Sequence, residues 1–182
     1  MIQSRRNFLR SAGMVAAAGA LTACTVTTSG KTTTLTLNTA KVKAYGQAGI
    51  NAVTTILSIT AVSTAMGAPA VAAIEAAGGA LSVSLSAFAT QTNGSLTVSY
   101  DNTDAKTRID TLLVDLNNAA VALRAGLVAA QQTVTNSVVN TAITTFNALL
   151  TVIDAFEGML GISLTSVTDT QEATALSTLA VK

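Results

Sequence analysis

The side chains in this sequence that could do chemistry are carboxylates and hydroxyls, because the 182-residue chain has no histidine and one cysteine. It therefore cannot build a cysteine–histidine zinc site or an iron–sulfur centre, and it lacks the commonest general base. Asp154 and Glu157 lie three residues apart on one predicted helix, and Asp110 and Asp115 lie on the helix expected beside it. Carboxylate bundles that bind two metal ions also need Glu-x-x-His motifs, which this chain lacks. We interpret the four acids as a solvated face and rank a carboxylate–metal enzyme third among the candidate functions.

The serine and threonine hydroxyls are abundant but have no base to activate them. No lysine lies in an apolar run that would lower its pKa, so nucleophilic catalysis is not predicted. The pair Gly78-Gly79 is not followed by the Lys and Ser/Thr of a phosphate-binding loop, which argues against a nucleotide site. The sequence therefore predicts no catalytic, cofactor-binding or metal-binding residue, and a protein that is not an enzyme.

Helical periodicity dominates the second half of the chain. Two apolar stripes recur at alternating steps of three and four residues, as expected of helices that bury one face. Between them, the polar residues 133–137 predict a turn, with Thr135 or Asn136 as the N-cap, although one helix over residues 103–161 stays open. The first stripe is Ile109, Leu113, Leu116, Ala120, Leu123, Leu127, Ala130 and Val134, and the second is Ala142, Phe146, Leu149, Ile153, Phe156 and Leu160.

Two further stripes precede these, and a proline separates them. Pro69 ends the first, since proline disfavours a helical residue before it and is tolerated in a first helical turn. Small residues are frequent in both, and Gly78-Gly79 predicts a kink or a close contact with a neighbouring backbone. The stripes are Val42, Tyr45, Gly49, Val53, Ile56 and Thr60, then Val71, Ile74, Gly78, Leu81, Leu85 and Phe88.

These elements predict an all-α fold, an antiparallel four-helix bundle formed by residues 41–162. A minor two-stranded β element is expected, because residues 34–38 and 95–100 alternate polar and apolar side chains, the latter after an Asn-Gly turn. Residues 163–182 are expected to form a C-terminal tail, or a short helix beginning near Asp169.

The N-terminus has the composition of a leader rather than of a folded segment. Basic residues are followed by a short uncharged apolar stretch at residues 11–20, which has the length of a signal peptide and not of a spanning helix. This block resembles twin-arginine signal peptides, which implies that the export machinery is a partner. The residues that carry the motif are Ser4, Arg5, Arg6, Phe8, Leu9 and Arg10.

A second short motif ends the leader. Leu21, Thr22, Ala23 and Cys24 resemble the lipobox of bacterial lipoproteins. The resemblance implies removal of residues 1–23 and acylation of Cys24, with chains such as palmitate, so that the cysteine anchors the protein to a membrane. Residues 24–40 then form an acylated cysteine and polar tether. In many of the lipoproteins that this motif resembles, an Asp after the cysteine retains the protein in the inner membrane. The residue here is Thr25, so the resemblance implies an outer-membrane location facing the periplasm.

Charge and hydropathy limit the remaining functions. Removal of the leader leaves seven basic residues against nine acidic ones, so no basic surface for nucleic acid is predicted. We expect a structural or protein-interaction role in the cell envelope, with no cofactor and an unknown envelope protein partner. The alternative is a membrane-inserting, pore-forming or self-associating helical protein, because residues 44–74 and 76–100 carry no charge. The polar side chains and Pro69 within the first of these runs argue against insertion.

Overall fold

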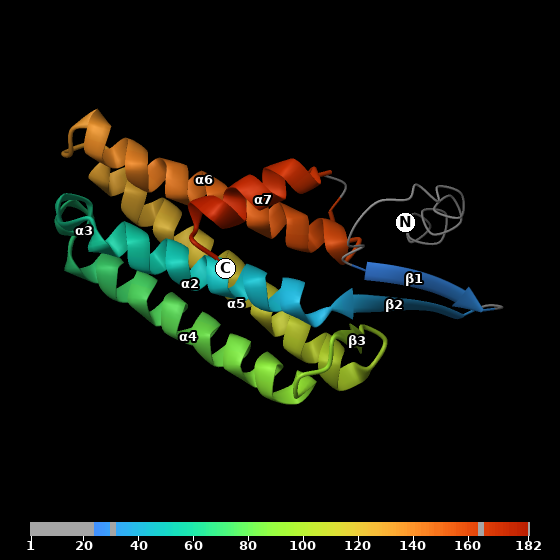
Figure 1. Cartoon of the computed structure of the whole chain (residues 1–182). Helices are drawn as coiled ribbons and strands as arrows, with labels where there is room; N and C mark the ends of the chain where they lie inside the picture. Colours follow the sequence, from blue (N-terminus) through green and yellow to red (C-terminus); the bar gives the residue numbers. More distant parts are fainter. Residues whose placement is uncertain (1–23, 30–31, 164–165, 182) are drawn as a thin grey trace, which may run out of the picture.

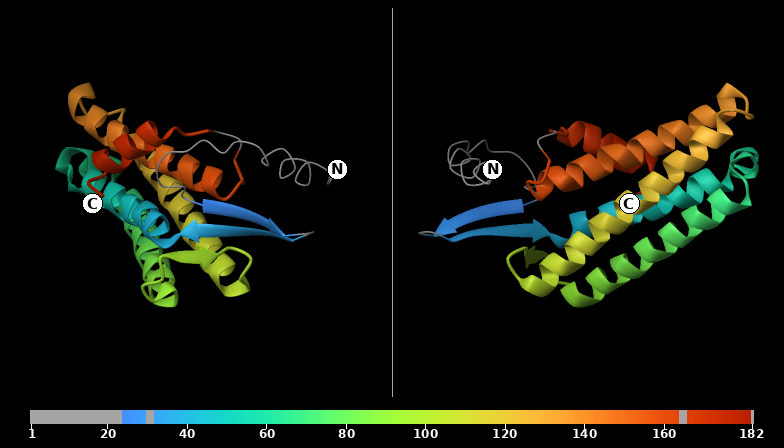
Figure 2. Two further views of the ribbon diagram at one scale, coloured as in Figure 1. Left: turned by 45° about the vertical axis from the view of Figure 1, so that its right-hand side comes forward. Right: turned by 180° about the vertical axis from the view of Figure 1, so that it is seen from behind.

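The structure, a computed structural model, describes residues 24–29, 32–163 and 166–181. Four long helices run alternately up and down as an elongated bundle (Figure 1), which confirms the predicted all-α class with a minor β element. Figure 2 shows the same bundle from two further sides, with α4 and α5 adjacent. The long helices are α2 (Thr39–Ser58), α4 (Ala68–Thr92), α5 (Thr103–Ala130) and α6 (Asn136–Met159).

The predicted apolar stripes fill the core of the bundle. Leu116 and Leu123 of α5 are completely buried, and Phe146 and Ile153 of α6 are nearly so. Burying a side chain of this size contributes about 1.5–3 kcal/mol relative to leaving it in water. The packing of these stripes against one another is therefore the main stabilising interaction, as expected for a chain with a single cysteine.

Helices α5 and α6 are separate, so the single helix left open by the sequence does not form. The chain leaves α5 after Ala130 and enters α6 at Asn136, with Thr135 as the N-cap. At the start of α5, the side chain of Asn102 accepts hydrogen bonds from the backbone N–H groups of Asp104 and Ala105. These bonds satisfy helix-terminal donors that would otherwise lack a partner.

The first predicted helix is broken, which the sequence did not predict. Helix α2 ends at Ser58, and a short helix, α3 (Thr60–Met66), leaves at an angle of 89°. Ile59 between them has an extended backbone. The bend lets Val62 and Met66 close the end of the bundle, where both are buried.

Glycines allow the helices to approach closely. A Cβ atom added at Gly49 of α2 would lie 2.3 Å from Cδ1 of Leu116 and 2.5 Å from Cδ2 of Leu81, so the side chains of α4 and α5 pack directly against the backbone of α2 there. In α4, a Cβ at Gly78 would lie 3.0 Å from Cγ1 of Val53. Helix α4 is continuous through Gly78-Gly79, and the close contact there is with a side chain of α2.

A three-stranded antiparallel sheet extends from the end of the bundle where α2 begins (Figure 1). The predicted pairing is present, since Leu37 lies opposite Val98. A third strand, which the sequence did not predict, pairs with the other edge of the strand that contains Leu37. Residues 24–40, which were expected to form a polar tether, therefore contribute two strands and the first residues of α2. Threonine is β-branched and favours strands, which explains these two strands. The strands are β1 (Cys24–Ser29), β2 (Thr32–Asn38) and β3 (Thr97–Ser99), in the order β1-β2-β3.

The C-terminal segment forms the short helix that the sequence left as one option. Helix α7 (Asp169–Thr178) packs against α6 and α2. Its first turn is closed by a capping box, in which the Thr168 hydroxyl accepts from the Gln171 backbone and the Gln171 side chain accepts from the Thr168 backbone.

Three helices in the described part of the chain are long and apolar enough to cross a membrane, judged by length and composition. They are α4, α5 and residues Ser137–Met159 of α6, and the bent pair α2–α3 qualifies as a fourth when taken together. In the most apolar window of α4, 22% of the residues are buried. Most of this helix therefore presents uncharged side chains to the outside of the bundle.

Candidate functional site

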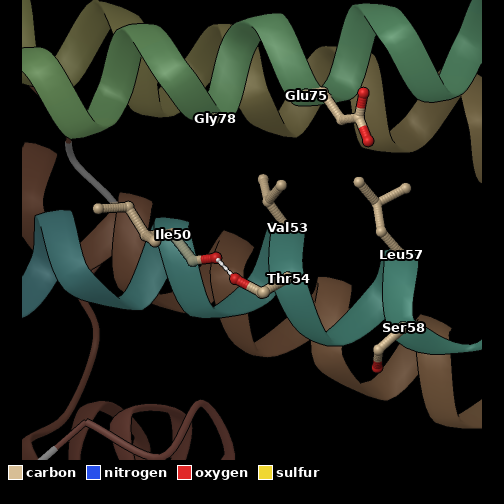
Figure 3. A pocket seen from close by; sticks show the side chains of 7 residues that line it. All are labelled: Ile50, Val53, Thr54, Leu57, Ser58, Glu75 and Gly78. Atoms are coloured by element: carbon tan, nitrogen blue, oxygen red, sulfur yellow. Dashed lines mark hydrogen bonds between the residues drawn. The ribbon is translucent and has the colours of Figure 1, made fainter.

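A groove of about 480 Å³ lies between α2 and α4. Val53 and Leu57 point from α2 toward α4, and Gly78 lies on the opposite wall (Figure 3). Because the glycine has no side chain, Val53 lies directly against it, with Cγ1 3.0 Å from the place that a Cβ atom of residue 78 would take. Ile50 extends the apolar surface at one end. The groove can therefore accept an apolar group.

The polar side chains of the groove are not arranged for catalysis. The hydroxyl of Thr54 donates to the backbone carbonyl of Ile50 in its own helix, and that of Ser58 donates to Thr55. Glu75 is the one carboxylate among the lining residues, and no lysine or arginine lines the groove with it. General acid–base chemistry needs a titratable group placed beside a nucleophile or a second such group, so this arrangement favours binding over reaction.

The four acids singled out by spacing are not brought together. Among the residues that the structure describes, no group of three or more acidic or cysteine side chains could hold a metal ion. Asp115 accepts a hydrogen bond from the buried hydroxyl of Ser84 in α4, and Glu157 accepts one from Asn117 at 3.5 Å. Asp110, Asp115 and Glu157 therefore have different partners, and all four acids are half-buried and do not form one solvated face.

Asp110 belongs to a small polar cluster at the start of α5. It accepts from the hydroxyl of Tyr100 and pairs with the ammonium of Lys106, which lies 4.7 Å from the centre of the Tyr100 ring. Burial and the hydrogen bond to Asp110 raise the pKa of Tyr100. Hydrogen bonds to Asp110 and Tyr100 raise the pKa of Lys106. The phenol thus stays protonated and the amine stays charged, and the cluster joins the β3 end of the sheet to α5.

A buried charge cluster that the sequence analysis missed connects α7 to α2. The Glu172 side chain forms an ion pair with Nζ of Lys41 at 2.8 Å and accepts from the hydroxyl of Tyr45 at 2.9 Å. Tyr45 is completely buried, and its ring centroid lies 5.2 Å from that of Phe156 in α6. Both carboxylate oxygens of Glu172 are therefore satisfied, and the cluster holds α7 on the bundle.

A pattern in the sequence could have indicated this cluster. Glu172 shares one face of α7 with Ala175 and Leu179, which are buried. An acid on the apolar side of a short amphipathic segment needs a partner, because an unpaired charge is costly to bury. The identity of that partner, Lys41, depends on how α7 folds back over more than a hundred residues, which periodicity does not reveal.

Replacing Glu172 with leucine is expected to lower the free energy of unfolding by about 1–3 kcal/mol, as for loss of hydrogen bonds to a charged group. Glu172→Gln keeps an acceptor for Tyr45 and should cost less. Urea unfolding measures both values, and limited proteolysis reports release of α7. Glu75→Leu is the matched control, since Glu75 is exposed and should change stability by less than about 0.5 kcal/mol. Equal losses in the free energy of unfolding for Glu172→Leu and Glu75→Leu would contradict a structural role for the cluster.

The predicted export and lipidation residues lie mainly outside the described part of the chain. The export motif from Ser4 to Arg10 and the lipobox residues Leu21, Thr22 and Ala23 precede it. Cys24 is the first described residue, and it begins β1 with its backbone opposite Leu37. The predicted acylation point is thus directly joined to the folded domain.

Comparison with known proteins supports the export signal. A family model for the twin-arginine translocation pathway signal sequence matches residues 3–22. No curated protein and no solved structure matches the chain. The chain therefore has a twin-arginine signal peptide at its N-terminus and is an exported protein with a helical-bundle fold.

Proposed function

We propose that the exported chain is a lipid-anchored helical protein of the bacterial cell envelope, with a structural or protein-interaction role and no enzymatic activity. The observation that supports this most directly is the position of Cys24. It follows the matched signal after one residue and is the first residue of strand β1. Cleavage before Cys24 would therefore remove the leader without cutting into any described element.

An acyl anchor at Cys24 would place a membrane beside one particular end of the molecule. Strand β1 pairs with β2, and β2 leads directly into α2, so Cys24 lies near the end of the bundle where α2 begins. Stable attachment takes more than one acyl chain, which the diacylglyceryl group implied by the lipobox would supply. Thr25 after the cysteine supports an outer-membrane location facing the periplasm.

The groove between α2 and α4 supports a binding role rather than a catalytic one. Its lining includes the apolar side chains of Ile50, Val53 and Leu57, and its hydroxyls donate to backbone carbonyls of their own helix. A partner protein could place an apolar side chain there, with Glu75 at the edge available to a basic group. Such a contact needs no cofactor.

Membrane insertion is the second candidate function, and α4 favours it. This helix is long and apolar enough to span a membrane. Only 22% of the residues in its most apolar window are buried within the bundle, so most of its apolar surface is free to contact lipid. Insertion would require the bundle to open, because Leu81 and Phe88 of α4 pack in the core. The experiment on the anchor separates the two candidates.

Replacing Cys24 with alanine is expected to release the protein from membranes or to leave an unprocessed precursor, because the acylated side chain is removed. Fractionation of cells, with mass spectrometry of the mature N-terminus, measures the outcome. Cys24→Ser also removes the acylation site but keeps a side chain of similar size, so it should behave like Cys24→Ala. Agreement between the two variants would show that the effect comes from loss of the thiol and not from the change in size. An unchanged mature mass and unchanged attachment would refute the lipoprotein proposal. Loss of the acyl mass with full retention in membranes would favour insertion through the helices.

A further inference from the structure

The outer face of α5 carries a second apolar seam, which we call the outer seam. It consists of Val114, Asn118, Val121, Ala125 and Val128, at alternating steps of four and three residues. All five are exposed, and the three valines are 56%, 69% and 55% exposed. This is the spacing of the a and d positions of a heptad repeat, with the valines at d and Asn118 and Ala125 at a.

Packing within the bundle does not account for the outer seam. The stripe of α5 that fills the core, which includes Leu116 and Leu123, lies on the opposite side of the helix. A bundle helix that faces water on its outer side normally carries charged and polar residues there. The outer seam therefore has the pattern of a helix–helix interface without a described partner.

We propose that the outer seam binds the same seam of a second copy of this chain, with the two α5 helices parallel and in register. None of its five side chains is charged, so pairing the seam with itself desolvates no charge. Aspartate and arginine lie beside it, at Asp115 and Arg124, and each already has a contact inside its own chain: Asp115 with Ser84, and Arg124 over the ring of Phe146.

Asn118 determines the direction of the pairing. In a parallel pair, residues at a face residues at a, so the two Asn118 amides would hydrogen-bond to each other. In an antiparallel pair, a positions face d positions, and each amide would lie against a valine. Burying an amide without a hydrogen-bond partner is unfavourable. A single asparagine at a is the established way in which coiled coils fix register at some cost in stability.

The size of the seam indicates a weak dimer. From Val114 to Val128 the helix rises about 21 Å at 1.5 Å per residue. A single helix face of this length covers less than the roughly 800 Å² per partner that stable complexes bury. Two copies held on one membrane would meet far more often than in solution, so the dimer would be populated there. This last step rests on the proposed anchor, whereas the seam contact itself does not.

Single cysteines test the pairing in cells that express the full chain. The variants V114C, V121C and V128C each place one thiol on the outer seam, and T144C places one on an exposed position of α6 as the matched control. After mild oxidation, each of the three seam variants should give disulfide-linked dimers, with a yield about tenfold above that of T144C because the paired thiols have a high effective concentration. Adding V121E to V114C should lower the yield at least about tenfold through like-charge repulsion. The melting temperature measured by circular dichroism should stay unchanged, since Val121 is exposed.

Several outcomes would overturn the proposed pairing of the outer seam, and each differs from the result expected if Cys24 is not acylated. Equal yields at the seam and at T144C would show that the seam does not pair. Dimers through V121C without dimers through V114C and V128C would exclude the parallel register. A polarity-sensitive fluorophore on V121C that shifts to the blue on phosphatidylethanolamine–phosphatidylglycerol vesicles, without any disulfide dimer, would make lipid the occupant. Failure of the anchor appears separately, as dimers through an unacylated Cys24 in the parent chain.

Discussion

Replacing both Arg5 and Arg6 with lysine is expected to abolish export, with the full-length precursor accumulating in the cytoplasm. The substitution keeps the positive charge of the leader. It removes the two guanidinium groups, whose planar fork of donors an ammonium does not reproduce. Both arginines lie within residues 3–22, which match the twin-arginine signal model. The export step should therefore depend on the type of basic residue and not on charge alone.

Cell fractionation with an antibody against the mature domain measures this effect. Arg10→Lys is a matched control, because it changes a third basic residue of the same leader without touching the pair. Export of the double lysine variant at the parent level would show that the general secretory route carries the protein. The choice of route would then have to be explained without the twin-arginine motif.

The fold is compatible with a route that carries folded cargo, which the resemblance to twin-arginine signals implies. Most of the bundle is made of helices that follow each other in sequence and pack as neighbours, as α4, α5 and α6 do. Folds rich in such local contacts form quickly. Contacts between distant segments are present as well: α2 packs against α6, where the ring of Tyr45 contacts that of Phe156, and Leu37 pairs with Val98 in the sheet. No bound cofactor is needed to explain folding before export.

The features predicted correctly from sequence are those that depend on periodicity and local capping. The buried positions of α5, such as Leu116 and Leu123, follow from a regular repeat, and Thr135 is the N-cap of α6, one of the two residues that the polar segment predicted. The pairing of β2 with β3 followed from alternation. Each of these depends on residues within a few positions of one another or on one repeated spacing.

The features missed depend on packing between distant segments. The bend at Ile59 is accompanied by burial of Val62 and Met66 in α3, and no residue near Ile59 signals a break as a proline would. Glu172 finds Lys41 only after α7 has folded back onto α2. The groove is lined by Val53 of α2 and Gly78 of α4, and periodicity within one helix does not show which residues of two helices lie opposite each other.

The predicted site residues differ in how far the sequence alone could identify their roles. The export motif is linear, so sequence alone was sufficient to find it, and a family model matches residues 3–22. The lipobox is linear too, but its function at Cys24 rests on the resemblance and stays a prediction. The four acids were selected by spacing on separate helices, and the structure gives them different partners, with Asp110 bound to Tyr100 and Lys106.

Replacing Leu123 with alanine is expected to lower the free energy of unfolding by about 2–5 kcal/mol, because the substitution removes buried apolar contacts and leaves a cavity. Leu123 is completely buried in the centre of the α5 stripe. Natural domains are stable by only about 5–15 kcal/mol, so the loss is a large share of the total. Urea unfolding of the purified protein measures it.

Val121→Ala is the matched control, since Val121 lies two residues earlier on the same helix and is 69% exposed. At concentrations where the protein is monomeric, this change should alter stability by less than about 0.5 kcal/mol, as for ordinary surface positions. The two faces of α5 would then be separated by function: the Leu123 face stabilises the bundle, while the Val121 face is available for contact with another molecule. A large loss at Val121 with little at Leu123 would mean that α5 packs through its other face, and both the described core and the outer seam would be wrong.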